Sequence, residues 1–406
     1  MQKGDCMGIL NGLKILDFTT LLPGPFATMM FADMGADVLR VESPTRVDMV
    51  KEMTPQIDGL SATHHQLNRS KQSIALDLKT TGAVELVKKL IQEYDIVIEQ
   101  FRPGVMEKFG LDYETLKKEN PKLIYCSITG YGQTGPYKNR AGHDNNFLAI
   151  SGMLDYSRRK GERPVPQGVQ IADLAGGSMH AVIGILAAAL KRTETGKGDY
   201  IDISMTDTAF SLNAMFGPAY LAEGTEPKAE QLLLNGGSFY DYYETKDGRY
   251  FSVGSLEPPF FKMLCETLEA PELLPLGLAT ELEEQQQLKQ ALQQKFQEKD
   301  FREWQAIFGE DFNGCVEPVL TFKEATEHPQ LQAREAVVEV PTTNGETLQQ
   351  LAFPIKFQHA KPVYKHTGSK LGVHVENVLK EQGISQAQYE AWQQQGVFGE
   401  ERRVRR

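Results

Sequence analysis

The stretch LKILDFTTLLPGPFATMMFADMGADVLRVE, residues 13–42, decides the fold of this chain. It begins with an apolar run, residues 13–18, that is typical of a buried strand. The turn Pro23-Gly24-Pro25 and an apolar helical stretch follow, and Gly35 ends that stretch. Residues 37–42 form a second strand-like run, so the whole stretch has the size of one strand–helix–strand crossover.

The same alternation of strand-like and helix-like segments continues downstream. It is seen in residues 73–77, 82–94, 95–99, 123–128, 176–192 and 200–204. Such alternation predicts an α/β domain with a doubly wound, mostly parallel, Rossmann-like sheet. Ligands of such sheets bind outside the carboxyl ends of the strands. In this chain those ends are residues 19–25, 42–46, 100–104 and 129–135.

The character of the sequence changes near residues 222–230, where glycine, proline and charged residues gather. Beyond this point, residues 239–244 and 249–253 flank the turn signal Lys246-Asp247-Gly248, which predicts a hairpin. A Gln- and Glu-rich stretch, residues 281–299, is typical of a solvated helix. We therefore expect a smaller α+β domain from residue 223, after residues 1–222 of a larger domain.

Composition excludes several classes of function. The net charge of −11 argues against a nucleic-acid partner. The four cysteines, Cys6, Cys126, Cys265 and Cys315, are far apart, which argues against a zinc site or a disulfide framework and fits the reducing cytoplasm. The longest apolar run, residues 181–190, is too short to span a bilayer. We therefore expect a cytoplasmic protein without a membrane partner.

Common catalytic motifs are absent from the sequence. The P-loop pattern does not occur. The nucleophile elbow of serine hydrolases and the paired histidines of zinc proteases are also missing. The pair His64-His65 is expected in an exposed loop. No metal is therefore expected in the active site.

His143 and Asp173 are the strongest candidates for chemistry. Each lies in a glycine-flanked segment, Gly142-His143-Asp144 and Asp173-Leu174-Ala175-Gly176-Gly177, and the second opens a strongly apolar helix. Judged by residue type alone, Asp173 is a helix cap and His143 a loop residue. Together they indicate a metal-free pocket that handles protons. The glycine pair would let a ligand approach backbone N–H groups that stabilise an oxyanion.

Ten ordered segments of the chain resemble one family. They are Leu10–Phe18, Pro23–Phe26, Gly35–Glu42, Asn68–Lys71, Leu76–Lys79, Phe101–Gly104, Ile128–Gly132, Gly142–Asp144, Ala172–Gly177 and Cys315–Val319. In this order they resemble the class III CoA-transferase family, the CaiB/BaiF type. That family includes formyl-CoA transferase and α-methylacyl-CoA racemase.

The resemblance implies an architecture as well as a ligand. Family members form interlocked homodimers, in which the large domain is built from both chain ends. The small domain would then span residues 223–330, and residues 331–406 would return to the large domain. The expected ligand is an acyl-CoA thioester, with coenzyme A as part of the substrate and no covalently bound cofactor.

The resemblance also assigns catalytic roles. Asp173 corresponds to the carboxylate that attacks the thioester in transferases and acts as an acid or base in racemases. A histidine precedes that aspartate in racemases, and here it is His143. Glu257 matches a third racemase residue and would come from the partner chain, whereas Asp144 would hold the local network. Val169 stands where racemases carry asparagine.

The residues expected to bind coenzyme A follow the same resemblance. The phosphates would contact arginine or lysine side chains, and strand ends would line the adenine and pantetheine groups. The candidates are Arg40, Leu76, Asp77, Leu78, Lys79, Gln100, Phe101, Arg102, Lys108, Gly142, Asn145, Asn146 and Phe147.

Three functions fit these observations. The first is an epimerase that moves the α-proton of a 2-methylacyl-CoA thioester. The second is a CoA-transferase that works through an acyl–Asp173 anhydride. A run of consecutive glycines that formyl-CoA transferase has in its small domain is missing here, where Gly236-Gly237 is the nearest match, and this favours the epimerase. The third is a paralogue that binds coenzyme A without catalysis.

Overall fold

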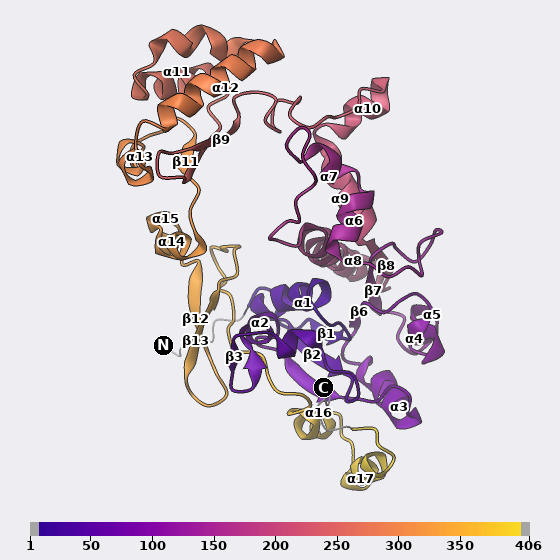
Figure 1. The fold of residues 1–406 in the computed structure, drawn as a ribbon. Coiled ribbons are helices and arrows are strands. Elements are labelled where there is room, and N and C mark those ends of the chain that lie inside the picture. Colours follow the sequence, from indigo (N-terminus) through magenta and orange to yellow (C-terminus); the bar gives the residue numbers. More distant parts are fainter. Residues whose placement is uncertain (1–7, 399–406) are drawn as a thin grey trace. The chain divides into compact units, whose positions relative to one another are not determined.

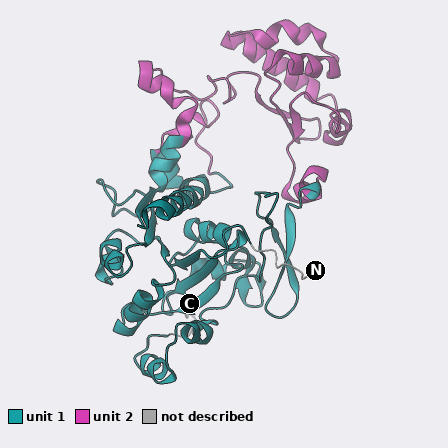
Figure 2. Ribbon diagram, turned by 180° about the vertical axis from the view of Figure 1, so that it is seen from behind, with its two compact units in different colours: residues 1–150, 167–211, 332–406 teal, residues 151–166, 212–331 magenta. Residues whose placement is uncertain are grey.

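The computed structural model describes residues 8–398, which form two compact units (Figure 2). The first unit comprises residues 1–150, 167–211 and 332–406, and the second comprises residues 151–166 and 212–331. The domain boundary predicted from the change in composition near residue 222 therefore differs in part from the boundary between these units. Residues 151–166 belong to the second unit because Arg159 pairs there with Glu230 and Asp241, contacts that no local pattern reveals.

A six-stranded sheet organises the first unit (Figure 1), and its strands run in the order β5–β2–β1–β6–β7–β8. Their bounds are β1 (Lys14–Asp17), β2 (Asp37–Glu42), β5 (Gln72–Ala75), β6 (Ile96–Glu99), β7 (Ile124–Thr129) and β8 (Tyr200–Ser204). Every neighbouring pair is parallel, which confirms the predicted doubly wound α/β sheet. The strand order reverses its direction between β1 and β6, the topological switch point at which such sheets bind ligands.

Helices cover both faces of this sheet. One core cluster joins Leu16, Leu39 and Val97 to α3 (Thr81–Leu90) and to the C-terminal helices α16 (Val375–Glu381) and α17 (Gln386–Gln394). Alternate strand residues point to the other face, where α1 (Pro23–Asp33) and α8 (His180–Thr195) pack.

The remaining elements of the first unit are short. They are η1 (Met49–Glu52), β3 (Gln56–Ile57), β4 (Leu60–Ser61), α2 (Ala62–Leu67), α4 (Val105–Lys108), α5 (Tyr113–Glu119), α6 (Asp144–Ile150), the π-helix η2 (Ala172–Met179), α9 (Met205–Ser211), β12 (Val337–Pro341) and β13 (Thr347–Leu351). Helix α15 (Pro329–Ala333) crosses the boundary between the units.

The second unit has its own aromatic core, in which Phe251, Phe296 and Trp304 are buried. Strands β9 (Asp241–Glu244) and β10 (Tyr250–Val253) form the predicted hairpin, and β11 (Val316–Pro318) extends it. Its helices are α7 (Met153–Tyr156), η3 (Leu212–Ala214), α10 (Gly217–Glu223), α11 (Pro258–Thr267), η4 (Pro271–Leu278), α12 (Leu282–Phe296), α13 (Phe301–Ile307) and α14 (Phe322–Glu327).

Helix α8 is apolar on both sides. Ala181, Val182 and Ile185 are buried, whereas Ile183 and Leu190 on the other side, and Met179 at the end of η2, are exposed. As a result, the helical segment Ala172–Thr195 is long and apolar enough to cross a membrane by length and composition, although such a segment also occurs in soluble proteins. The exposed stripe marks a surface that a partner could cover.

The histidine pair differs from its expectation. His64 and His65 are buried in α2, where His64 Nε2 lies 2.9 Å from the Ser369 carbonyl and Nδ1 lies 3.1 Å from the Asn68 amide. The prediction of an exposed loop was wrong because residues of the C-terminal segment, far away in sequence, cover this helix. Burial lowers the pKa of His64 to about 3, so its imidazole stays neutral at physiological pH.

Candidate active site

Asp173 lies in the first turn of the π-helix η2, which runs directly into α8. The carbonyl of Asp173 accepts a hydrogen bond from Ser178 Oγ at 3.0 Å, and the same hydroxyl lies 2.6 Å from the Pro23 carbonyl. π-Helices are rare and often occur at functional sites. The sequence predicted a helix from residue 176, and the structure begins it at Ala172, so Asp173 is inside the helix.

The carboxyl group of Asp173 is partly buried beside a second carboxylate. Asp144, at the start of α6, accepts a hydrogen bond from the Asp173 backbone N–H at 3.0 Å. Burial, with the charge of Asp144 adding to it, raises the pKa of Asp173 to about 7. No salt bridge reaches Asp173 among residues 8–398. An aspartate in this state can accept and return a proton near neutral pH.

His143 immediately precedes Asp144 and is exposed. Its backbone N–H donates to Asn146 Oδ1 at 2.9 Å, and its carbonyl accepts from the Asn146 N–H at 2.8 Å. These bonds fix the backbone and leave the imidazole without a hydrogen bond within the described chain. His143 and Asp173 thus lie on two segments that are linked by the hydrogen bond from the Asp173 N–H to Asp144.

Phe147 is a structural residue, contrary to its predicted role in coenzyme A binding. Its side chain is buried and packs edge-to-face on Tyr131. A Cβ atom on Gly142 would lie 2.6 Å from the Phe147 ring, and one on Gly130 only 2.3 Å. The ring therefore occupies the space that these glycines leave, and a ligand can reach only the backbone near Gly142. Asn145 and Asn146 are exposed on α6.

The predicted oxyanion site at this helix start is wrong. A Cβ atom on Gly176 would lie 2.7 Å from Thr208 Oγ1, and one on Gly177 would lie 3.1 Å from Pro23. The glycine pair therefore lets α9 and α1 pack closely on η2 rather than admitting a ligand. The N–H groups of Asp173 and Leu174 already donate to Asp144 and to the Gln170 carbonyl.

The two loops at the switch point are joined directly. Gln100, after β6, accepts a hydrogen bond from the Gly24 N–H at the start of α1 through Oε1 at 3.1 Å. Phe101 beside it is half-buried, and Arg102 and Lys108 are exposed. Both loops lie at carboxyl ends of parallel strands, so these predicted coenzyme A contacts share one edge of the sheet.

The loop after β5 contains the other predicted contacts. Leu76 is buried in the core cluster, so its side chain packs there and only its backbone is left for the predicted contact. Asp77 Oδ1 accepts the Lys79 N–H at 3.1 Å, and the Asp77 N–H donates to the Val397 carbonyl. Leu78 is half-buried and Lys79 is exposed.

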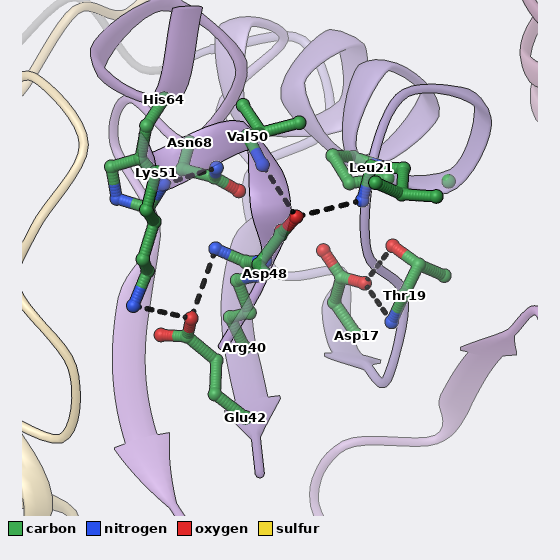
Figure 3. A network of polar contacts seen from close by, with 12 residues as sticks. Asp17, Thr19, Leu21, Arg40, Glu42, Asp48, Val50, Lys51, His64 and Asn68 are labelled. Atoms are coloured by element: carbon green, nitrogen blue, oxygen red, sulfur yellow. Dashed lines mark hydrogen bonds and ion pairs between the residues drawn. The ribbon is translucent and has the colours of Figure 1, made fainter. Parts of the chain in front are cut away.

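Arg40 is buried within a polar network (Figure 3), not at the surface. Its Nη2 lies 2.5 Å from Asp48 Oδ2, and its Nη1 lies 3.1 Å from Glu42 Oε1, which also pairs with Lys51. A phosphate contact would have to compete with these carboxylates. Nevertheless Nε has no hydrogen-bond partner among the described residues, so this guanidinium keeps one unused donor.

The segment Asn68–Lys71 supplies two more buried cations. Arg69 forms a bidentate pair with Asp33, at 2.7 Å and 2.6 Å. Lys71 Nζ lies 3.4 Å from Asp17 Oδ2 and donates to the Pro25 carbonyl at 2.9 Å. Sequence reasoning noted the motif but gave it no role. Arg69 and Lys71 thus hold the two ends of α1 through Asp33 and Pro25. The first turn of α1 also contacts η2, because the Pro23 carbonyl accepts a hydrogen bond from Ser178.

Three further residues complete the candidate set. Glu257 is exposed in the second unit, at the residue before α11. Val169 is also exposed. The second unit contains a cavity of about 700 Å³, lined among others by Tyr240, Tyr242 and the exposed thiol of Cys315. Cys126 and Cys265 are buried free thiols, and Cys6 lies outside the described residues.

Comparison with known proteins decides the family. The family model described as CoA-transferase family III matches residues 10–375. The chain belongs to CoA-transferase family III. It is 36% identical to the α-methylacyl-CoA racemase of Mus musculus, across 93% of this chain and 94% of that protein. It is 32% identical to the succinyl-CoA:glutarate CoA-transferase of Homo sapiens, across 92% and 85%.

Solved structures agree with this assignment. A CaiB/BaiF family protein from Brucella suis superposes with a TM-score of 0.80 and 31% identity, across 93% of this chain and all of that one. Members of CoA-transferase family III are racemases or CoA-transferases, and both groups are similar to this chain. Family membership therefore establishes an acyl-CoA enzyme family and leaves the reaction to the site.

Proposed function

We propose that this protein epimerises 2-methylacyl-CoA thioesters by moving the α-proton from one face to the other. The supporting observation is Asp173, whose pKa of about 7 and lack of a cationic partner suit an acid or base. A transferase nucleophile works as an ionised carboxylate, which a lower pKa would favour. His143 supplies the second group, and its imidazole is free to reach a substrate.

In this mechanism one group removes the α-proton while the thioester spreads the developing charge onto its oxygen. The other group returns a proton to the opposite face, which inverts the centre. His143 serves one face and Asp173 serves the other. Asp144 holds the backbone of Asp173, and burial together with the charge of Asp144 keeps the pKa of the Asp173 carboxyl high. No metal takes part in any of these steps.

The test follows one enantiomer of 2-methylbutanoyl-CoA by chiral separation. We expect both enantiomers to appear, and we expect His143→Ala to slow this conversion by roughly 10²–10³-fold. The CoA-transferase alternative predicts instead an acyl–Asp173 anhydride and exchange of coenzyme A between two carboxylic acids. His143→Ala would then leave the exchange intact, and the enantiomer would stay unchanged.

A paralogue that only binds coenzyme A is the third possibility. It would bind the thioester, and it would show neither epimerisation nor exchange with any acid tested. The raised pKa of Asp173 argues against it, because perturbed carboxyls of this kind cluster at catalytic sites.

We further propose that the active protein is a cytoplasmic homodimer in which Glu257 of the partner subunit orients His143. The exposed apolar stripe along η2 and α8, formed by Met179, Ile183 and Leu190, supports a partner surface. Mixing inactive Asp173→Asn with inactive Glu257→Gln tests this. Reassorted mixed dimers would each hold one complete site and restore about a quarter of the activity. A monomer in sedimentation, or no restoration after proven reassortment, would contradict it.

A further inference from the structure

Glu99 is a buried carboxyl to which the proposed chemistry gives no role. It is the last residue of β6, and only 4% of its surface is exposed. Oε2 accepts a hydrogen bond from the backbone N–H of Phe101 at 2.7 Å. The side chain also bonds to Ser127 on β7, whose hydroxyl oxygen accepts from Tyr200 at 3.1 Å. Glu99 therefore holds the first turn of the loop that leaves β6.

No cation of residues 8–398 compensates this carboxyl. Among the described residues the charge that acts on it is that of Asp202 on β8, which is negative. Glu99 in turn raises the pKa of Tyr125, Cys126 and Tyr200, and none of these groups carries positive charge. Burial raises the pKa of Glu99 to about 7, and Asp202 adds to this effect. A neutral glutamine of the same shape would avoid the cost of burying a charge. An acid kept here at a cost to stability points to a function.

The position of the loop indicates what that function is. β6 and β1 flank the switch point of the sheet, where ligands of doubly wound folds bind. Glu99 fixes Phe101 on one side of this point. Gln100, between them, binds the Gly24 N–H on the other side at 3.1 Å. Residues 99–101 thus link the loop after β6 to the loop after β1, at the edge of the sheet where ligands are expected to bind.

We propose that Glu99 is a positioning residue for substrate binding: by holding the Phe101 backbone it keeps the loop of residues 100–102 in the form that binds an acyl-CoA thioester. The inference rests on the proposed function, because it takes a CoA thioester as the ligand. The ionised carboxylate holds the N–H more strongly than the protonated acid, since charge-assisted hydrogen bonds are about twice as strong as neutral ones.

The experiment measures equilibrium binding of 2-methylbutanoyl-CoA from pH 6 to pH 9 by calorimetry. Asp173→Asn is the parent, so that turnover and the titration of Asp173 do not contribute. Glu99→Gln keeps the shape and an acceptor oxygen but loses the charge. Glu99→Asp keeps the charge but is too short to reach the Phe101 N–H. Glu119→Gln, at the exposed end of α5, is the matched control.

We expect the Glu99→Asp variant of the parent to bind about tenfold more weakly at pH 9, where a charge-assisted hydrogen bond is lost, and about threefold more weakly at pH 6, where the lost bond is a neutral one. Glu99→Gln should bind about threefold more weakly than the parent at pH 9 and equal it at pH 6, where the parent's Glu99 is protonated. The Glu119→Gln control should follow the parent throughout. Melting temperatures should show that Glu99→Gln is at least as stable as the parent.

Unchanged affinity in both Glu99 variants would overturn the proposal. So would a loss of stability with unchanged affinity, because that result describes a structural residue. If Glu99→Gln does not fold, Glu99→Asp alone decides by the same criterion. A parent that binds no thioester at all contradicts the proposed function instead, so the two failures can be told apart.

Discussion

Two regions of the first unit bury charge in opposite ways. Around Arg40 and Arg69 every buried charge has a partner of opposite sign, as in the bidentate pair of Arg69 with Asp33. Asp173 and Glu99 lie in the same unit without a cation. The pKa values show the consequence. Burial alone would raise the pKa of Glu42, but Arg40 and Lys51 hold it at about 2.

Asp173 and Glu99 instead have pKa values of about 7, because burial is not opposed by a positive charge. The paired region is thus built for architecture, and Arg40 and Lys51 keep Glu42 ionised at physiological pH. The unpaired carboxyls can change protonation state there, which makes them suitable for catalysis and for control of binding. The following changes separate the two roles.

The largest effect is expected from Asp173→Asn. The amide neither accepts nor returns a proton, so we expect epimerisation to fall by roughly 10³–10⁴-fold. Initial rates with a single enantiomer measure this, with circular dichroism as a check on folding. A variant that retains even a tenth of the wild-type rate would remove Asp173 from the mechanism.

Breaking a paired charge should instead cost stability. Asp33→Ala leaves the Arg69 guanidinium buried and without its carboxylate, and we expect the free energy of unfolding to fall by about 3–5 kcal/mol. Denaturant unfolding measures this change. The exposed ion pair of Lys117 with Glu114 is the control, and Glu114→Ala should change stability by less than about 1 kcal/mol. Equal losses of stability in Asp33→Ala and Glu114→Ala would show that the buried pair stabilises the protein no more than the exposed one.

Asp173→Asn should have the opposite effect on stability. Between about pH 4 and pH 7 the folded protein retains a proton on Asp173 that the unfolded chain has lost, so this group stabilises the fold less as pH rises. At pH 8 the variant should be more stable than the wild type by about 2 kcal/mol, roughly half of what the full pKa shift would supply. At pH 4 the difference should vanish. Lower stability at pH 8 would show that Asp173 has an unseen charge partner.

A smaller effect is expected from Asp144→Asn. The asparagine oxygen can still accept the Asp173 N–H, whereas the negative charge that raises the pKa of Asp173 is gone. The limb of the pH–rate profile that reports Asp173 should move to lower pH, with little change in the maximal rate. A shift to higher pH, or none, would show that Asp144 does not act electrostatically on Asp173.

Much of the fold could be predicted from the sequence. The strands of residues 37–42 and 200–204 have the expected bounds, because apolar runs between turn residues carry a local signal. The pair Asp173 and His143 stays a prediction that rests on the same kind of signal, glycine-flanked turns beside a helix. The hairpin turn at residues 246–248 is another local signal that the structure confirms.

The rest depends on contacts between distant segments. Burial of Arg40 and His64 results from packing of loops and of the C-terminal segment, which no spacing in the sequence reveals. The role of Gly176 follows from its approach to Thr208, and the raised pKa of Glu99 follows from strands on either side of it. A pattern identifies which residues are unusual, whereas packing decides what they do.

The most direct test of Asp173 as a catalytic acid or base is the exchange of hydrogen for deuterium at the α-carbon of the substrate. The wild-type protein is incubated with 2-methylbutanoyl-CoA in heavy water, and mass spectrometry follows the α-position. We expect one deuterium to enter at the α-carbon at a rate similar to that of epimerisation, and none to enter with Asp173→Asn. Recovery of undeuterated, unepimerised thioester from the wild-type protein would contradict this account.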